Sequence, residues 1–226
     1  MKLYRKIEYL LSIPKSLYCS LRLFPFNQAV KLPMFVRYNT AIRSVMGGVK
    51  VEKRLIRPGL LKVGFNRVGI FDVKYERSIL EICGTIELKG SATFGLGSRI
   101  CVLKSGKLII GDNFLGQAHG VIICDNSITI GKNVLTSWDT LIMDTDFHQA
   151  LDLCTKIAKE KSAPIFIGDN VWICQKALIL KNSSIPSGCI VGAQSVVNKK
   201  FTNANCLLAG SPATTKKENI TINRDV

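Results

Sequence analysis

Two histidines, His119 and His148, are the only imidazole groups in this sequence of 226 residues. His148 ends the stretch "TLIMDTDFH", in which strand-like apolar residues give way to polar ones at Asp144. An imidazole has an unperturbed pKa of about 6.5, so it can take a proton from a hydroxyl and later return it to a leaving group. Asp146 or Asp144 would orient the ring. We therefore consider His148 as a candidate general base that Asp146 would orient, against the default that a lone loop histidine is merely solvated.

The cysteines do not point to metal or redox chemistry. Eight are scattered along the chain and none forms a CxxC motif, so neither a zinc cluster nor a disulfide framework is expected. We interpret them as small buried thiols and predict no metal site.

A six-residue repeat must position these groups. From Ile167 the chain reads "IGDNVW ICQKAL ILKNSS IPSGCI VGAQSV V". The first position of each hexad is always aliphatic, and the fifth is mostly small. Three such hexads make one triangular coil of a β-helix, in which the aliphatic residues point inward and stack on the next coil. The aliphatic positions are Ile167, Ile173, Ile179, Ile185, Val191 and Val197.

The repeat continues upstream with an interruption. "IGDNFLGQAHGVII" aligns with "IGKNVLTSWDTLIM" at a shift of 20 residues, but the next unit begins 37 residues later. Between residues 144 and 164 the pattern vanishes and the sequence turns polar. We therefore predict one coil plus an excursion loop over 144–164, and long loops in compact domains tend to be functional. Residues 78–113 read as one or two irregular starting coils.

The N-terminal quarter is basic and does not repeat. Residues 1–57 hold twelve Lys and Arg but only two acids, Glu8 and Glu52. Leu3, Ile7, Leu10 and Leu11 would share one helical face, and Pro14 should break or restart that helix. We expect a short-helix arm that covers the open end of the solenoid.

The charge of this arm suits an acidic polymer or an anionic membrane surface. It carries no recognised nucleic-acid motif, so we expect no nucleic-acid partner. No apolar run is long enough for a membrane span, and the start is interrupted too early for a signal peptide. These features predict a cytoplasmic protein, with peripheral membrane contact through residues 1–57 as an open question.

Four motifs in order resemble the hexapeptide-repeat acyltransferases. They are the hexads from Ile167, the "DFH" before the excursion, the hexad "VGAQSVV" and the tail "LLAGSPA". The resemblance covers Ser78 to about Lys217. It is greatest to galactoside and maltose O-acetyltransferases and to the O-acetyltransferases of capsule and lipopolysaccharide synthesis.

The resemblance implies a left-handed parallel β-helix, which is an exception to the usual right-handed crossover rule. It also implies a homotrimer with acetyl-CoA as co-substrate between adjacent subunits. The chain then divides into a basic, partly helical arm (1–60), a β-helix acyltransferase domain (61–200) and a C-terminal tail (201–226). The expected activity is O-acetylation of a sugar or polysaccharide precursor.

The resemblance also assigns roles to single residues. It places the catalytic histidine at His148, whereas His119 is expected to have a structural or acceptor-side role. Asp125 and Gln117 match acceptor-binding positions, although Asp125 could equally be a turn residue. Donor-binding positions match Trp172, Gln175, Gly192, Ala193, Lys199 and Lys217.

Three other functions were weighed. A zinc carbonic anhydrase of this fold needs three histidines per site, and this chain has two in total. A nucleotide-sugar N-acetyltransferase or a serine acetyltransferase stays open on the same fold. A non-catalytic β-helix that binds anionic glycan or membrane also stays open and predicts no CoA binding.

Overall fold

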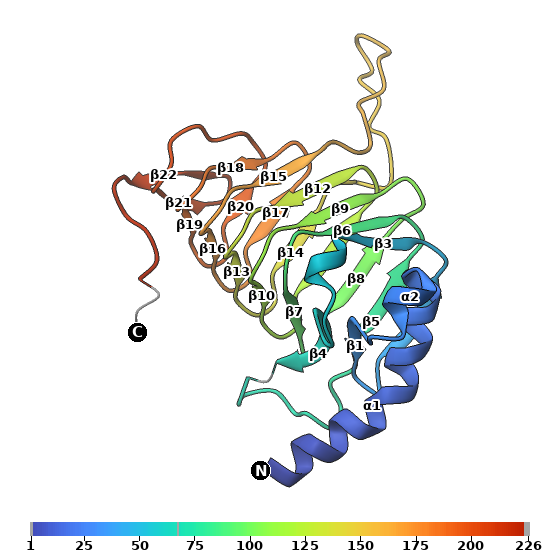
Figure 1. The fold of residues 1–226 in the computed structure, drawn as a ribbon. Helices are drawn as coiled ribbons and strands as arrows, with labels where there is room; N and C mark the ends of the chain where they lie inside the picture. Colours follow the sequence, from blue (N-terminus) through green and yellow to red (C-terminus); the bar gives the residue numbers. More distant parts are fainter. Residues whose placement is uncertain (1, 67, 224–226) are drawn as a thin grey trace.

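Three parallel sheets form the faces of a triangular solenoid in the computed structural model, which describes residues 2–66 and 68–223 and side chains from residue 6 onward (Figure 1). From β1 to β17, each strand pairs with the strand three places later, so three successive strands make one coil. The first face holds β1 (Met34–Val36), β4 (Leu61–Asn66), β7 (Ala92–Gly95), β10 (Phe114–Gly116), β13 (Leu135–Thr136), β16 (Trp172–Ile173), β19 (Ile190–Val191), β21 (Leu207–Gly210) and β22 (Ala213–Lys217).

The other two faces are built in the same way. The second face holds β2 (Ala41–Val45), β5 (Ile79–Ile82), β8 (Arg99–Val102), β11 (Val121–Cys124), β14 (Leu141–Met143), β17 (Leu178–Leu180) and β20 (Val196–Val197). The third face holds β3 (Gly48–Val51), β6 (Thr85–Leu88), β9 (Lys107–Ile110), β12 (Ser127–Ile130), β15 (Ile165–Ile167) and β18 (Ser184–Ile185). We call the turns from first to second face the first corner, from second to third the second corner, and from third to first the third corner.

The hexads form the core as predicted. All six aliphatic positions from Ile167 to Val197 are fully buried, and the small fifth positions are buried beside them. Ile130, Ile167 and Ile185 stack in register through three successive coils. The fold is a left-handed parallel β-helix, and this prediction is confirmed.

Asparagines let the chain turn at the third corner. Asn113, Asn133 and Asn170 have φ values of 57°, 54° and 56°, a left-handed conformation that Asn tolerates better than most residues. Their side-chain amides are hydrogen-bonded from coil to coil, at 3.0 Å between the first two and 3.1 Å between the last two. These hydrogen bonds partly offset the free-energy cost of the left-handed backbone conformation. They also hold successive coils in register.

The predicted excursion over 144–164 is confirmed. β15 follows it directly and pairs with β12, with Ile128 opposite Ile165, so a single coil is interrupted at the second corner. Figure 1 shows the segment as a long projection away from the solenoid. Two antiparallel bridges, Thr145 with Ser162 and Leu151 with Ala158, make it a hairpin.

A second excursion was not predicted. It leaves the first corner between β4 and β5, and residues 68–78 of it are described. The excursion has no six-residue period, and it follows a strand that lies before the regular repeat begins. An interruption of the period therefore could not be recognised there. It brings Phe71 and Glu76 to a corner two coils further along.

The solenoid begins earlier and ends later than the predicted boundaries at 60 and 200. β1, β2 and β3 form a complete first coil, because Met34, Ala41 and Gly48 pair in parallel with residues of the second coil. At the other end, β21 adds a further strand to the first face, and β22 folds back on it antiparallel.

The helix α1 (Lys2–Leu23) runs unbroken through Pro14, so the prediction of a break there is wrong. It packs across β1, β2 and β3 and, with α2 (Phe26–Ala29), covers the N-terminal end of the solenoid (Figure 1). The side chain of Leu3 lies outside the described residues.

Serines explain why the helix continues past the proline. Ser12 accepts a hydrogen bond from the backbone N–H of Tyr38 at 3.0 Å, and Ser16 accepts one from Val36 at 2.9 Å. These contacts lie on either side of Pro14 and satisfy the open edge of β1, whose groups would otherwise lack partners. No helix in the described ranges is long and apolar enough to cross a membrane.

Candidate active site

His148 lies at the root of the hairpin, five residues beyond the end of β14. Its side chain is exposed, and no hydrogen bond to it is found within the part of the chain that the structure describes. A rigid strand and an anchored hairpin root therefore present an imidazole whose nitrogens face solvent. Such a group is available to accept a proton from a bound hydroxyl.

Asp125 anchors this hairpin root. The Ser162 hydroxyl donates to its Oδ2 at 2.6 Å, and Nζ of Lys161 lies 3.1 Å from the same oxygen. The hydrogen bond from Ser162, together with the Lys161 ammonium, holds the pKa of Asp125 below its usual range. Oγ of Ser162 also lies 2.8 Å from Oγ1 of the buried Thr145, so both hairpin arms are tied together.

Asp144 is fully buried and serves the neighbouring turn. Its two carboxylate oxygens accept the backbone N–H groups of Asp125 at 2.7 Å and Asn126 at 2.9 Å. Burial raises the pKa of Asp144 above its ordinary value. Its contacts hold the turn that carries Asp125 and do not reach His148.

Asp146 is exposed, and its carboxylate pairs with Nζ of Lys181 at 2.7 Å. The structure thus gives both acids that were predicted to orient His148 other partners in this chain. The orienting role stays a prediction.

Most of the predicted donor residues lie together, away from His148. Trp172 points outward from the first face between the buried Val171 and Ile173, and its indole N–H donates to Oγ of Ser137 at 3.1 Å. Gln175 lies at the first corner of that coil.

Gly192 and Ala193 lie at the same corner one coil further, where the N–H of Gln194 donates to the carbonyl of Gln175 at 2.9 Å. Ala193 is exposed, whereas a Cβ added at Gly192 would lie 3.0 Å from Cβ of Ala209. A side chain at this position would have to displace Ala209 by a few tenths of an ångström, so the packing favours glycine.

The two predicted lysines are on other parts of the surface. Lys199 follows β20 at the second corner, and its Nζ lies 5.3 Å from the ring centroid of Phe201. Lys217 ends β22 and is exposed. Within one chain, the predicted donor set is therefore not a single cluster.

The first corner also carries the second histidine. His119 has a carboxylate on each side, with Nε2 bonded to Glu76 and Nδ1 at 3.2 Å from Asp139, and Phe71 packs on its ring at 4.2 Å between centroids. His119, Glu76 and Asp139 border a cavity of about 300 Å³. Gln117 accepts a hydrogen bond from Asn66 at 2.8 Å on the same corner.

Two side chains near the first corner, Glu76 and Trp138, were not among the predicted site residues. Glu76 belongs to the unpredicted second excursion. Trp138 lies at the first corner next to Gln175, and its indole N–H is buried without an acceptor in the described chain. An orphaned buried donor is costly and calls for a partner outside the chain. The only available signal was its corner position, one coil before Gln175.

No group of three or more His, Cys, Asp or Glu side chains that could hold a metal ion occurs among the residues with described positions. All eight cysteines are free thiols, and burial raises the pKa of Cys174 to about 11, so it is a poor nucleophile at neutral pH.

Comparison with known proteins gives relatives over most of the chain. No family model matches the sequence. Galactoside O-acetyltransferase of Escherichia coli (strain K12) is 33% identical over 172 residues, which cover 74% of this chain and 79% of that protein. An uncharacterized 24.8 kDa protein in the cps region of Klebsiella pneumoniae is 34% identical over 137 residues; the match spans 61% of this chain and only 60% of that protein's length.

Two solved structures share the fold. The polySia specific acetyltransferase NeuO superposes with a TM-score of 0.62 at 22% identity, covering 84% of this chain and 79% of NeuO. The polysialic acid O-acetyltransferase OatWY has a TM-score of 0.57 at 22% identity, covering 85% of this chain and 88% of its own. At this identity the likeness concerns the architecture alone.

Proposed function

The chain belongs to the hexapeptide-repeat O-acetyltransferases, and on this premise we propose that it transfers an acetyl group from acetyl-CoA to a hydroxyl of a sugar or polysaccharide precursor, with His148 as general base. One observation carries the proposal. His148 is an exposed imidazole with no hydrogen bond to any described residue, and it is held at the root of a hairpin that polar contacts fix to the solenoid.

His148 would move one proton in two directions. It takes the proton of the acceptor hydroxyl as that oxygen attacks the thioester carbonyl carbon. When the C–S bond breaks, the imidazolium returns the proton to the leaving CoA thiolate. The products are an acetyl ester and free CoA, so protons and electron pairs balance. Asp146 would orient the imidazole only if its bond to Lys181 is exchanged on substrate binding.

The first face and first corner fit the donor. Trp172 offers an aromatic wall and Ala193 an exposed edge without a large side chain. The buried N–H of Trp138 has no acceptor among the described residues, and the amide carbonyls of a pantetheine arm could supply one. Lys199 and Lys217 are exposed and could pair with CoA phosphates. Gln175 and Gly192 would line the corner between these groups.

A second copy of the chain would bring the two halves of the proposed site together. His148 leaves the second corner, whereas Trp172 and Gln175 belong to the first face and first corner. The hairpin also exposes Phe147, Leu151, Leu153 and Ile157, which is unusual for a free projection. We infer a homotrimer in which the hairpin of one subunit packs against its neighbour and places His148 beside the neighbour's donor wall.

The acceptor would lie between the hairpin root and the first corner of the neighbouring subunit. Gln117 and the cavity beside His119 offer amide, carboxylate and guanidinium groups for sugar hydroxyls. Asp125 is the weaker acceptor residue, because its carboxylate is already bonded to Ser162 and Lys161. Its role here is to hold the hairpin that carries His148.

The decisive experiment replaces the base. His148→Ala should lower kcat for acetyl transfer by about a hundredfold to ten-thousandfold, while CoA binding and the trimer persist. Lys156→Gln, an exposed change at the hairpin tip, is the control and should keep full activity. Acetyl transfer at the wild-type rate by the His148→Ala trimer would rule out the proposed base.

Acceptor and donor assays separate the alternatives. Labelled acetyl-CoA offered with sugar, amino-sugar and serine acceptors distinguishes O-acetylation from N-acetylation and serine acetylation. Calorimetry with CoA addresses the non-catalytic alternative, because a β-helix that only binds glycan or membrane would give no binding signal.

A further inference from the structure

We propose that the outer face of α1 binds an anionic lipid membrane surface, a function beyond acetyl transfer. The helix has the reverse of the usual amphipathic arrangement, with polar side chains on its buried face and apolar side chains on its exposed face. Its inward face is polar: Ser12, Ser16 and Ser20 are fully buried and serve the backbone of β1 and the residues after it. The strand edge needs hydrogen-bond partners, so the serines face inward and the apolar side chains are left facing out.

The outward face is apolar along the whole described helix. Leu10 is 63% and Leu11 57% exposed, and five more large apolar side chains are between 38% and 51% exposed. At about 100° per residue they form one continuous stripe, with Lys6 inside one edge, next to Ile13, and Arg22 just beyond the other edge. An apolar stripe with basic borders is the pattern of helices that lie in a membrane interface. The five are Ile7, Ile13, Leu17, Tyr18 and Leu21.

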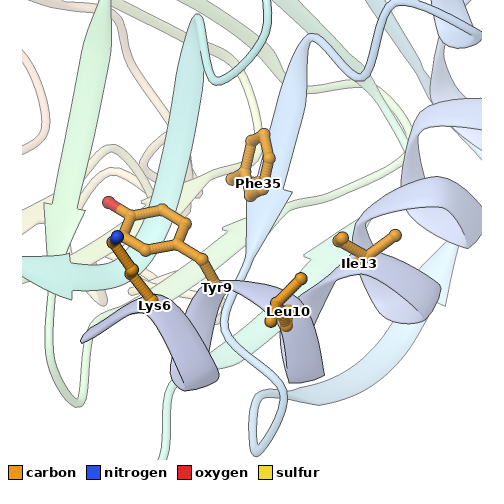
Figure 2. A pocket seen from close by; sticks show the side chains of 5 residues that line it. All are labelled: Lys6, Tyr9, Leu10, Ile13 and Phe35. Atoms are coloured by element: carbon orange, nitrogen blue, oxygen red, sulfur yellow. The ribbon is translucent and has the colours of Figure 1, made fainter. Parts of the chain in front are cut away.

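A groove opens along one side of this stripe (Figure 2). It has a volume of about 480 Å³ and is lined by Tyr9, Leu10, Ile13 and Phe35, with Lys6 beside them. Tyr9 stacks on Phe65 at 4.6 Å between ring centroids, which fixes the groove's aromatic wall. An apolar groove with one amine suits an acyl chain whose phosphate lies by the ammonium.

The basic charge around the outer face of α1 favours an anionic lipid surface over a second copy of α1 as its partner. The first 57 residues contain only two acids. Glu8 is buried against Arg37 at 2.6 Å, and Glu52 pairs with Arg54 at 2.7 Å. Two such surfaces placed face to face would oppose like charges, whereas anionic headgroups complement them. The helix lies at the end of the solenoid opposite β22, so a flat surface can approach it (Figure 1).

The test is flotation of the full chain with vesicles of phosphatidylcholine, with and without phosphatidylglycerol. We expect binding to the anionic vesicles that weakens with salt. Leu10→Gln/Leu11→Gln should weaken it by about tenfold or more, because these side chains lose their apolar burial. Lys6→Gln/Arg22→Gln should weaken it by about fivefold for each charge removed.

The matched control is Phe166→Gln, which changes an exposed apolar residue on β15 of the third face and should leave vesicle binding unchanged. Circular dichroism checks that each variant is folded. Three results would overturn the proposal: no flotation of the wild type, equal binding to neutral vesicles, or wild-type binding by the α1 variants. Sedimentation in which only the Leu10→Gln/Leu11→Gln variant loses subunits would instead make this face a contact between copies.

Discussion

At the scale of single residues, Asp144 illustrates what a carboxylate does when it is buried in a coil. Both of its oxygens accept backbone N–H groups from the turn that holds Asp125. Asp144→Asn replaces one acceptor with an N–H₂ group that faces another donor. We expect a loss of about 1–3 kcal/mol in the free energy of unfolding, measured by urea denaturation. Asp152→Asn makes the same change at an exposed turn and should cost less than half as much.

The pH dependence of this loss has a definite sign. Burial raises the pKa of Asp144 in the folded chain above its value of about 3.9 in the unfolded chain. The wild type therefore loses stability, relative to Asp144→Asn, as pH rises above about 4. The difference between the two proteins should be largest in acid and should shrink toward neutrality. A difference that grows with pH would contradict a raised pKa.

The sequence predicts where His148 leaves the solenoid, but it does not predict the contacts of the acids around it. The position of His148 follows from the end of a repeat, which is a local signal. The partners of Asp144 and Asp125 lie in other coils or across the hairpin, between 18 and 37 residues away. Such pairings depend on the coil register and on where the excursion re-enters, and neither is visible in the types of the residues themselves.

At the scale of elements, the hairpin depends on a small polar anchor. Ser162→Ala removes the hydroxyl that bonds Asp125 and contacts Thr145. We expect the root to open about fivefold more often, which corresponds to the loss of about 1 kcal/mol for one hydrogen bond. Hydrogen exchange at the amides of Asp146 and Ala163, which bond across the root, measures this opening.

Acid should open the same root. Because the pKa of Asp125 is lowered in the folded chain, its stabilising contribution is present above about pH 4 and is lost as the pH falls below that.

Thr155→Ala, a change at the hairpin tip, is the control for the Ser162→Ala variant. Equal exchange rates in Ser162→Ala and the wild type would show that the hydroxyl does not anchor the hairpin.

The elements differ in how well sequence predicts them. The late coils follow a strict six-residue period, so their faces and buried positions could be read directly. The first coil could not, because β1, β2 and β3 start seven residues apart and are joined by irregular turns. The unbroken helix through Pro14 has the same cause: its serines bind the edge of β1, and this tertiary contact outweighs a local helix breaker.

At the scale of the whole molecule, the two excursions and the helix divide the surface by task. The hairpin leaves the second corner, the 68–78 segment packs on the first corner, and α1 covers the N-terminal end of the solenoid. A solenoid allows this division, because each coil contacts only its neighbours and loops can be added at corners without disturbing the core. The proposed membrane face and the proposed acetyl-transfer site are thereby independent.

The division of the site between subunits can be tested by mixing two inactive chains. His148→Ala and Trp172→Ala each remove one half of every site in a homotrimer of a single variant. In a randomly mixed trimer, a site is intact when its His148 comes from the tryptophan variant and its Trp172 from the histidine variant. This occurs at about a quarter of the sites in an equal mixture with a cyclic interface. Co-refolded chains should therefore recover about a quarter of wild-type activity, measured with labelled acetyl-CoA, whereas separately folded trimers mixed afterwards should recover none. If His148 and Trp172 serve the same site within one chain, co-refolding restores nothing, and the hairpin would then act on its own subunit.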